Sequence, residues 1–94
     1  MAKAMWNGVT IAESEDFEVV DSNVYFPKSA LVTEHFTPSE TRSNCFWKGE
    51  ASYFNVVVDG QSNKDAAWAY QQPKKAASNI AGHVAFWKGV IVDR

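Results

Sequence analysis

Hydrophobic and polar residues alternate with a period of two along much of this 94-residue chain. Such spacing puts successive side chains on opposite faces of an extended backbone, so it predicts short β-strands joined by polar turns. The clearest run is 53–58, which is rich in the aromatic and β-branched residues that strands prefer. Asp59-Gly60 follows it and is typical of a tight turn.

The first half of the chain predicts a strand at 9–12 and a hairpin made of strands 17–20 and 23–26. Asp21 and Ser22 supply the polar residues that a hairpin loop needs. Pro27 has no backbone N–H and ends the second strand of this hairpin. Beyond it we expect a helical turn at 28–31, a strand at 31–36 and a turn at 37–40.

The second half predicts a central hairpin of strands 43–48 and 51–58, bending at Gly49-Glu50. A helix is expected after Pro73 and before Gly82. The other expected elements are a strand at 66–70 and a last hairpin of strands 83–87 and 90–93. The chain is therefore expected to be mainly β, with seven to nine short strands in a small bent sheet and one or two helical turns.

Length and composition favour a single domain over residues 1–94, with no nucleic-acid partner. The net charge is −2, unevenly distributed: residues 1–40 carry two basic and seven acidic side chains, and residues 41–94 carry seven and four. The mild positive charge of the second half suits a small anionic molecule. It is far short of the basic surface that binding to several phosphates of a nucleic acid requires.

One cysteine, Cys45, excludes an internal disulfide and favours a reducing compartment. No apolar run approaches the ~20 residues that cross a bilayer. The first eight residues lack the apolar stretch of a signal peptide. We therefore expect a cytoplasmic protein without a membrane partner.

The candidate ligand site consists of two segments rich in aromatic residues, 45–53 and 68–73, and of Lys48 within the first of them. Trp68 and Tyr70 share one face of their strand, and Tyr53 joins them if the two strands are neighbours. Lys48 would lie at the rim of this surface. Lysine supplies charge and donors, tyrosine supplies hydroxyls, and tryptophan supplies a flat apolar floor. The alternative is that the aromatic rings fill a core while Lys48 points into water.

Cys45 is the single candidate nucleophile, and with Lys48 it is the only candidate for a catalytic role. A reactive thiolate would need a nearby cation or histidine to lower its pKa. Strand alternation would place Lys48 on the opposite face from Cys45, and a lone cysteine on a strand is more typical of a small buried residue. His35 and His83 add no spacing typical of a metal site, so we expect neither metal nor cofactor.

Four motifs follow one another along the chain: Val24-Tyr25-Phe26-Pro27; Thr41 with Cys45-x-x-Lys48-Gly49-x-Ala51-x-Tyr53; Ala67-Trp68-x-Tyr70-x-x-Pro73; and Ile80-Ala81-Gly82-His83-Val84-Ala85-Phe86. In this order they resemble the family called domain of unknown function 427, to which a nucleotidyltransferase name is sometimes attached. The resemblance implies a small, mainly β, tent-like domain in which bent sheets meet over a groove. It also implies that six residues occupy recurrent family positions: Tyr25, Cys45, Lys48, Tyr53, Trp68 and Tyr70.

Three functions therefore compete. The first is binding of a small polar or anionic ligand in an aromatic-lined pocket formed by Tyr25, Lys48, Tyr53, Trp68 and Tyr70. The second is an enzyme, acting through Cys45 or by nucleotidyl transfer. The third is a protein-interaction module, for example a homodimer joined through an edge strand at 17–20.

Overall fold

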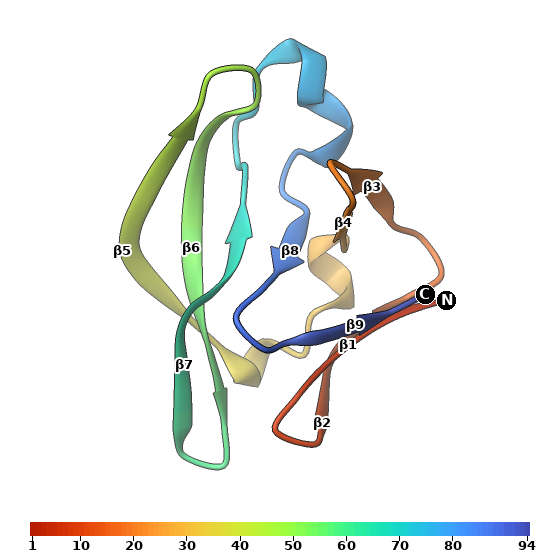
Figure 1. Ribbon diagram of the computed structural model, residues 1–94, viewed down its shortest axis with the longest axis vertical. Helices are drawn as coiled ribbons and strands as arrows, with labels where there is room; N and C mark the ends of the chain where they lie inside the picture. The colour runs from red at the N-terminus through yellow and green to blue at the C-terminus, as the bar shows by residue number, and fades with distance from the viewer.

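A computed structural model describes residues 1–94 and confirms the mainly β prediction (Figure 1). Nine strands form three antiparallel sheets, within the expected range of seven to nine. The strands of each sheet, in spatial order, are β2 (Val9–Ser14), β1 (Ala2–Trp6) and β9 (Ile91–Asp93); β3 (Glu18–Val20) and β4 (Asn23–Tyr25); and β5 (Phe36–Cys45), β6 (Gly49–Val58), β7 (Gln61–Ala69) and β8 (Val84–Phe86).

Turns occur at both places where their residues predict them, between β3 and β4 and between β6 and β7. β3 and β4 pair directly, as expected for residues 17–26. Asp21 and Ser22 between them have φ values of 53° and 66°. Positive φ at both central residues is the signature of the tight turns that fit the twist of a hairpin. Asp59 and Gly60 also have positive φ and join β6 to β7.

Residues 31–40 were predicted wrongly. The expected strand at 31–36 is largely a 3₁₀ turn, η2 (Thr33–His35); Leu31 makes an isolated bridge to Ala12, and Phe36 begins β5. The expected turn at 37–40 is instead part of β5. A strand can run through Pro38 because β5 lies at the edge of its sheet, where a missing N–H need not break the pairing.

The helical content takes the form of three short 3₁₀ segments. η1 (Lys28–Ala30) occupies the expected helical turn. In place of the expected helix over 74–81 lies η3 (Lys75–Ile80), which is interrupted at Ala77 with φ −117° and ψ 22°. A segment this short has too few hydrogen bonds to hold a regular α-helix. None of these helical segments has the length and apolar character needed to span a membrane.

The expected last hairpin, residues 83–93, is wrong in its pairing. Its two strands exist as β8 and β9, but β8 pairs with β7, and β9 pairs with β1. The sequence predicted no strand at the position of β1. All three residues of β8 are buried, so this strand is covered on both faces, whereas Ile91 of β9 is exposed. The chain thus passes from the four-stranded sheet to the three-stranded sheet.

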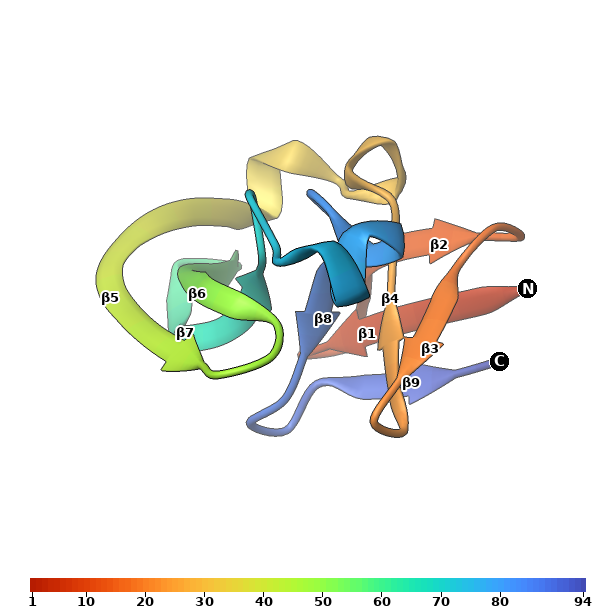
Figure 2. The ribbon, with the colours of Figure 1, turned by 90° about the horizontal axis from the view of Figure 1, so that it is seen from above.

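The four-stranded sheet is strongly bent, as the curvature of β5 in Figure 2 shows. In β5, the four steps from Pro38 to Arg42 match two steps, Phe54 to Ser52, in β6. In β7, the four steps from Asn63 to Ala67 match two steps, Val56 to Phe54, in β6. Extra residues of this kind bend a strand and increase its twist. The bulge of β5 thus lies opposite Tyr53 and that of β7 opposite Asn55, on either side of Phe54 in β6.

Asn55 lies opposite the bulge of β7, pairs with Thr37 of β5, and contacts both of these strands through its side chain. Its side-chain oxygen accepts a hydrogen bond from the backbone N–H of Asp65 at 3.0 Å, and its amide donates to the Thr37 hydroxyl at 3.2 Å. Asp65, with φ 58°, accepts a hydrogen bond from the Thr41 hydroxyl at 2.8 Å. Hydroxyls of Ser39 and Thr41 lower the pKa of the Asp65 carboxyl.

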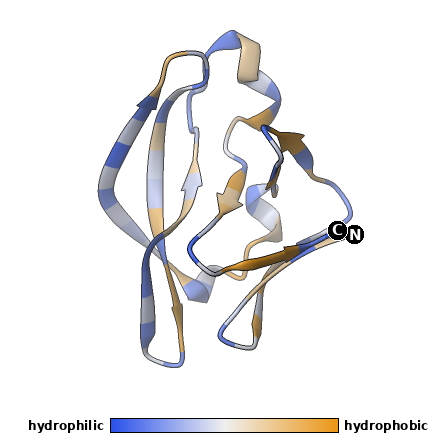
Figure 3. Ribbon diagram, viewed as in Figure 1, coloured by the Kyte–Doolittle hydropathy of each residue, from blue (hydrophilic) through white to orange (hydrophobic).

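The bent sheet has a hydrophobic cluster on each face. The larger cluster joins Phe26, Val56 and Phe86 to the inner side chains of β1 and β2. The smaller cluster joins Tyr25, Tyr70 and Ile80. Neighbours in one strand thus enter different cores, as strand alternation requires. Figure 3 shows that β5 is largely hydrophilic whereas β8 and β9 are hydrophobic.

Asn55→Ala should lower the stability of the protein by about 1–3 kcal/mol, because it removes two hydrogen bonds and leaves the N–H of Asp65 unpaired at the bend. Thermal or urea unfolding measures this change. Asn44→Ala is the matched control, since Asn44 lies on β5, is exposed and makes no side-chain hydrogen bond. Equal stability of the two variants would contradict the proposed role of Asn55.

Candidate functional site

A cavity of about 190 Å³ opens on the face of the sheet that carries the smaller cluster. All five residues that the sequence placed in a ligand site line this cavity. Their role in binding stays a prediction, but their convergence from four separate segments is a property of the fold. The lining residues are Asn23, Tyr25, Lys48, Tyr53, Trp68, Tyr70 and Trp87.

Cross-strand pairing explains why the aromatic residues meet. Tyr53 on β6 is paired with Trp68 on β7, and Trp68 is paired with Ala85 on β8. Paired residues point to the same face, so these three form one row across the sheet. Trp87 lies two residues beyond Ala85 and shares its face. Its ring meets that of Trp68 edge to face, with centroids 5.8 Å apart and planes at 80°.

Tyr25 reaches the same face from β4. Its ring is also edge to face with Trp68, at 6.3 Å and 89°, and its hydroxyl accepts a hydrogen bond from Trp68 Nε1 at 3.3 Å. The resulting right-angled arrangement fixes the Trp68 ring from two sides. Such contacts stabilise by about 0.5–1.5 kcal/mol beyond the burial of area. The cavity wall is therefore largely preformed.

Lys48 is nearly buried, with only 7% of its surface exposed. The alternative in which Lys48 points into water is therefore wrong. Its ammonium lies 4.9 Å from the Trp47 ring centroid and 5.8 Å from that of Tyr70, within the range of cation–π attraction. Its Nζ also lies 2.5 Å from Oδ2 of Asp21.

The charge of Lys48 survives this burial. Desolvation acts to lower its pKa, but the hydrogen bond with Asp21 and the electrostatic influence of Tyr25 and Tyr70 outweigh it, so the pKa is raised above 10.5. Lys48 is therefore a cation at neutral pH. Asp21 was missed as a site residue because it lies in the turn between β3 and β4, and no local pattern connects that turn with Lys48.

Two features of the backbone hold Lys48 in place. The turn before β6 covers residues 46–48, slightly earlier than the expected bend at Gly49-Glu50. Lys74 clamps this turn, since its N–H donates to Lys48 O at 2.8 Å and its ammonium donates to Phe46 O at 2.6 Å. Gly49 follows with φ 111°, a region that residues with a Cβ rarely adopt.

The hydroxyls of Tyr53 and Tyr70 differ in their hydrogen bonding. Tyr53 shares a hydrogen bond of 2.9 Å with the Ser43 hydroxyl, while the Tyr70 hydroxyl has no partner within the protein. Burial raises the pKa of both Tyr25 and Tyr70, and the charge of Lys48 only partly offsets this effect. Both phenols therefore stay protonated at neutral pH, and Tyr70 can donate to a guest in the cavity.

Asn23 and Trp87 are lining residues that sequence reasoning missed. A signal existed for Trp87, because alternation along residues 83–87 puts it on the same face as Ala85. Asn23 begins β4 and resembles an ordinary hairpin residue, so nothing in the sequence marks it. Both residues widen the predicted set without changing its aromatic character.

Cys45 ends β5, is half-buried and packs against the smaller cluster, but it does not line the cavity. Hydrogen bonds from the backbone N–H groups of Lys48 and Trp47 lower the pKa of its thiol. Strand alternation does not separate Cys45 from Lys48, because the chain turns directly after Cys45. The lowered pKa, which no sequence pattern reveals, comes from the backbone N–H groups of this turn.

The two histidines are engaged by backbone carbonyls. His35 Nδ1 lies 2.9 Å from the carbonyl oxygen of Val57, and His83 Nδ1 lies 3.1 Å from that of Ala81. The structure contains no group of three or more His, Cys, Asp and Glu side chains that could hold a metal ion.

Alkylation of Cys45 by iodoacetamide should reach half its maximal rate at a lower pH in the folded protein than in the urea-unfolded chain. The reason is that the turn lowers the thiol pKa from its ordinary value of about 8.5. Mass spectrometry of the labelled protein against pH measures both profiles. A folded profile that coincides with the unfolded one, or lies above it, would show that the turn does not activate the thiol.

Comparison with curated proteins finds no match to this chain. Comparison with protein-family models finds one match, described as Domain of unknown function (DUF427) and named NTP_transf_9, over residues 1–94. Because this match covers the whole chain, the protein belongs to the DUF427 family, as its motifs and its mainly β fold lead one to expect.

Proposed function

We propose that the whole chain acts as one ligand-binding domain that holds a small planar molecule with an anionic group in the aromatic-lined cavity. One observation carries this proposal: a charged lysine is buried at an aromatic cavity. Burying an ammonium group is costly unless it is paired. An apolar side chain of similar length would fill the same space without that cost, so a retained cation favours a binding role.

The contacts suggest a role for each side chain. Lys48 would attract the anionic group, and the Tyr70 hydroxyl would donate a hydrogen bond to it. The rings of Trp68 and Trp87 stand nearly perpendicular, so a planar ligand stacked on one would meet the edge of the other. Tyr53 and Asn23 would contact the rest of the ligand. The volume of about 190 Å³ suits a molecule smaller than the usual drug-sized ligand.

Asp21 would compete with such a ligand for Lys48. Its carboxylate already accepts from the ammonium, and its side chain is 55% exposed, so it can return to water when displaced. An anion lacking a ring would gain little by replacing it. The pair thus favours ligands that combine an anionic group with an aromatic body over simple salts.

Lys48→Met tests the proposal and separates binding from folding. Methionine fills similar space without charge, so we expect stability within about 1 kcal/mol of the unsubstituted protein, together with loss of binding. Small aromatic carboxylates, phosphate esters and nucleotides would be screened by thermal shift and by tryptophan fluorescence. Lys75→Met, at an exposed position, is the control. A ligand that stabilises Lys48→Met as strongly as the control would refute the proposal.

Affinity for an anion should stay constant between pH 6 and 9 as far as Lys48 is concerned. The raised pKa of Lys48 means that its charge, and the stability this charge contributes, is fully present below 10.5 and is lost only as pH rises further. Titrations of a ligand whose own charge is constant over this range would measure the effect. A steady decline beginning near pH 7 would point to another group as the anion receptor.

Asp21→Asn should strengthen anion binding by about threefold to tenfold, because it removes the competing charge. Asparagine also tolerates the positive φ of this position. Asp16→Asn, at an exposed site before β3, removes the same charge away from the cavity. Equal gains in both variants would mean that only net charge matters and that Asp21 does not compete.

An enzyme is the second candidate, favoured by the lowered pKa of the Cys45 thiol. A covalent intermediate on Cys45 would add the mass of an acyl group, so mass spectrometry after incubation with activated thioesters would detect it. The family model's name also makes nucleotide chemistry worth testing, by thermal shift with ATP and Mg²⁺. Failure of both measurements would leave ligand binding as the better proposal.

A cytoplasmic location and self-association complete the proposal. The single cysteine suits a reducing compartment. β3 pairs only with β4, so its other edge is available to a second copy, and Val19 on it is 44% exposed. Light scattering over a range of concentrations would detect a homodimer. A constant monomer mass would remove this edge as a self-association site.

A further inference from the structure

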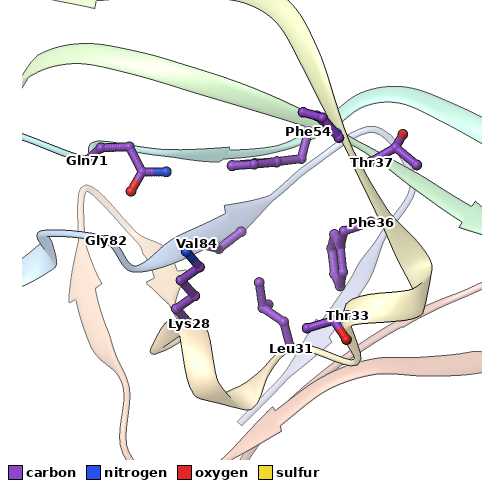
Figure 4. A pocket seen from close by; sticks show the side chains of 10 residues that line it. Lys28, Leu31, Thr33, Phe36, Thr37, Phe54, Gln71, Gly82 and Val84 are labelled. Atoms are coloured by element: carbon purple, nitrogen blue, oxygen red, sulfur yellow. The ribbon is translucent and has the colours of Figure 1, made fainter.

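A second cavity, of about 240 Å³, lies on the other side of the four-stranded sheet (Figure 4). Strand alternation separates it from the cavity around Lys48. Phe54 and Val84 line it, whereas their chain neighbours Tyr53 and Ala85 belong to the opposite face. No tryptophan lines this second cavity.

One end of the second cavity is apolar. Leu31, Phe36 and Phe54 form its walls, and Figure 4 shows the two phenyl rings on different sides of the space. Phe36 is held by the ring of Phe86, with centroids 5.9 Å apart. The Leu31 segment is held by its bridge to Ala12 and by the Val32 N–H, which donates to Ile11 O at 2.9 Å. These walls are therefore fixed by the larger core.

The other end is polar and holds a cation with no partner. Figure 4 shows the Lys28 side chain extending toward Val84, with Gln71 on the same side of the cavity and Phe36 on the far side. Lys28 and Gln71 are both exposed, and neither side chain makes a hydrogen bond or an ion pair within the protein, so both are free to contact a ligand at the cavity mouth. In the first cavity, by contrast, the Lys48 ammonium forms an ion pair with the Asp21 carboxylate.

We infer that the second cavity binds a small amphipathic carboxylate. The apolar body would lie between Leu31, Phe36 and Phe54, and the carboxylate would accept hydrogen bonds from the Lys28 ammonium and the Gln71 amide. Charge complementarity selects this class of occupant. A cation would be repelled by Lys28, and a plain hydrocarbon would gain nothing from the exposed ammonium and amide at the polar end. The volume, below the range of about 300–1,000 Å³ for typical pockets, limits the ligand to a small one.

The probe for this site is 4-phenylbutyrate, with 4-phenylbutan-1-ol as the uncharged analogue. Titration of the full chain, followed by ¹H–¹⁵N NMR, should give saturable shifts, and intermolecular NOEs should join the phenyl protons to methyl groups of Leu31 and Val84. Tryptophan fluorescence should hardly change. NOEs to Trp68 or Trp87, or the absence of saturable shifts at millimolar probe, would overturn the inference.

Lys28→Gln should weaken the binding of 4-phenylbutyrate by about fivefold, because a half-exposed ion pair contributes modestly, and should leave the alcohol unaffected. Lys75→Gln, another exposed lysine in a 3₁₀ segment, is the matched control and should change neither. Equal effects of the two substitutions would overturn the inference. NMR shifts that depend on protein concentration and not on probe concentration would also overturn it, because they would show that a second copy of the chain covers the cavity. Lys48→Met should bind the probe normally, which keeps this outcome separate from that of the proposed function.

Discussion

One amide side chain links three strands at the bend of the four-stranded sheet. The Asn55 oxygen of β6 accepts a hydrogen bond from a backbone N–H of β7, and its nitrogen donates to the Thr37 hydroxyl of β5, close to the positions where both of these strands carry extra residues. Bulges on two sides of a central strand would otherwise leave unpaired polar groups, which are costly where water is excluded. The bend lets one short sheet cover two separate apolar clusters.

Small residues on the sheet make room for both clusters. Ala67, Ala69 and Ala85 are fully buried, so large rings from β4 can pack closely against the backbone. Tyr25 and Phe26, adjacent in the chain, deliver one ring to each side. Each cluster ends in a cavity where rings meet a lysine, but only one of these lysines has an acidic partner. The two faces therefore present different electrostatic environments to small molecules.

Sequence reasoning succeeded where the determining interactions are local. Alternation placed Trp68 and Tyr70 on one face, with Tyr53 beside them if their strands are neighbours, and turn residues located the hairpin at Asp21-Ser22 and the turn at Asp59-Gly60. It failed where the structure depends on contacts between distant segments, because the pairing of strands far apart in the chain leaves no local sequence pattern. The partners of β8 and β9, the strand β1 and the ion pair of Lys48 with Asp21 all belong to this class.

The contact between Lys48 and Asp21 joins two hairpins, β3–β4 and β5–β6. A contact between residues this far apart in the chain carries a larger loop-closure cost than the turn within either hairpin. The cavity beside this contact therefore requires both hairpins to be in place. A molecule bound there would hold the two hairpins together and would act mainly on the rate of unfolding, giving the ligand-bound protein kinetic as well as thermodynamic protection.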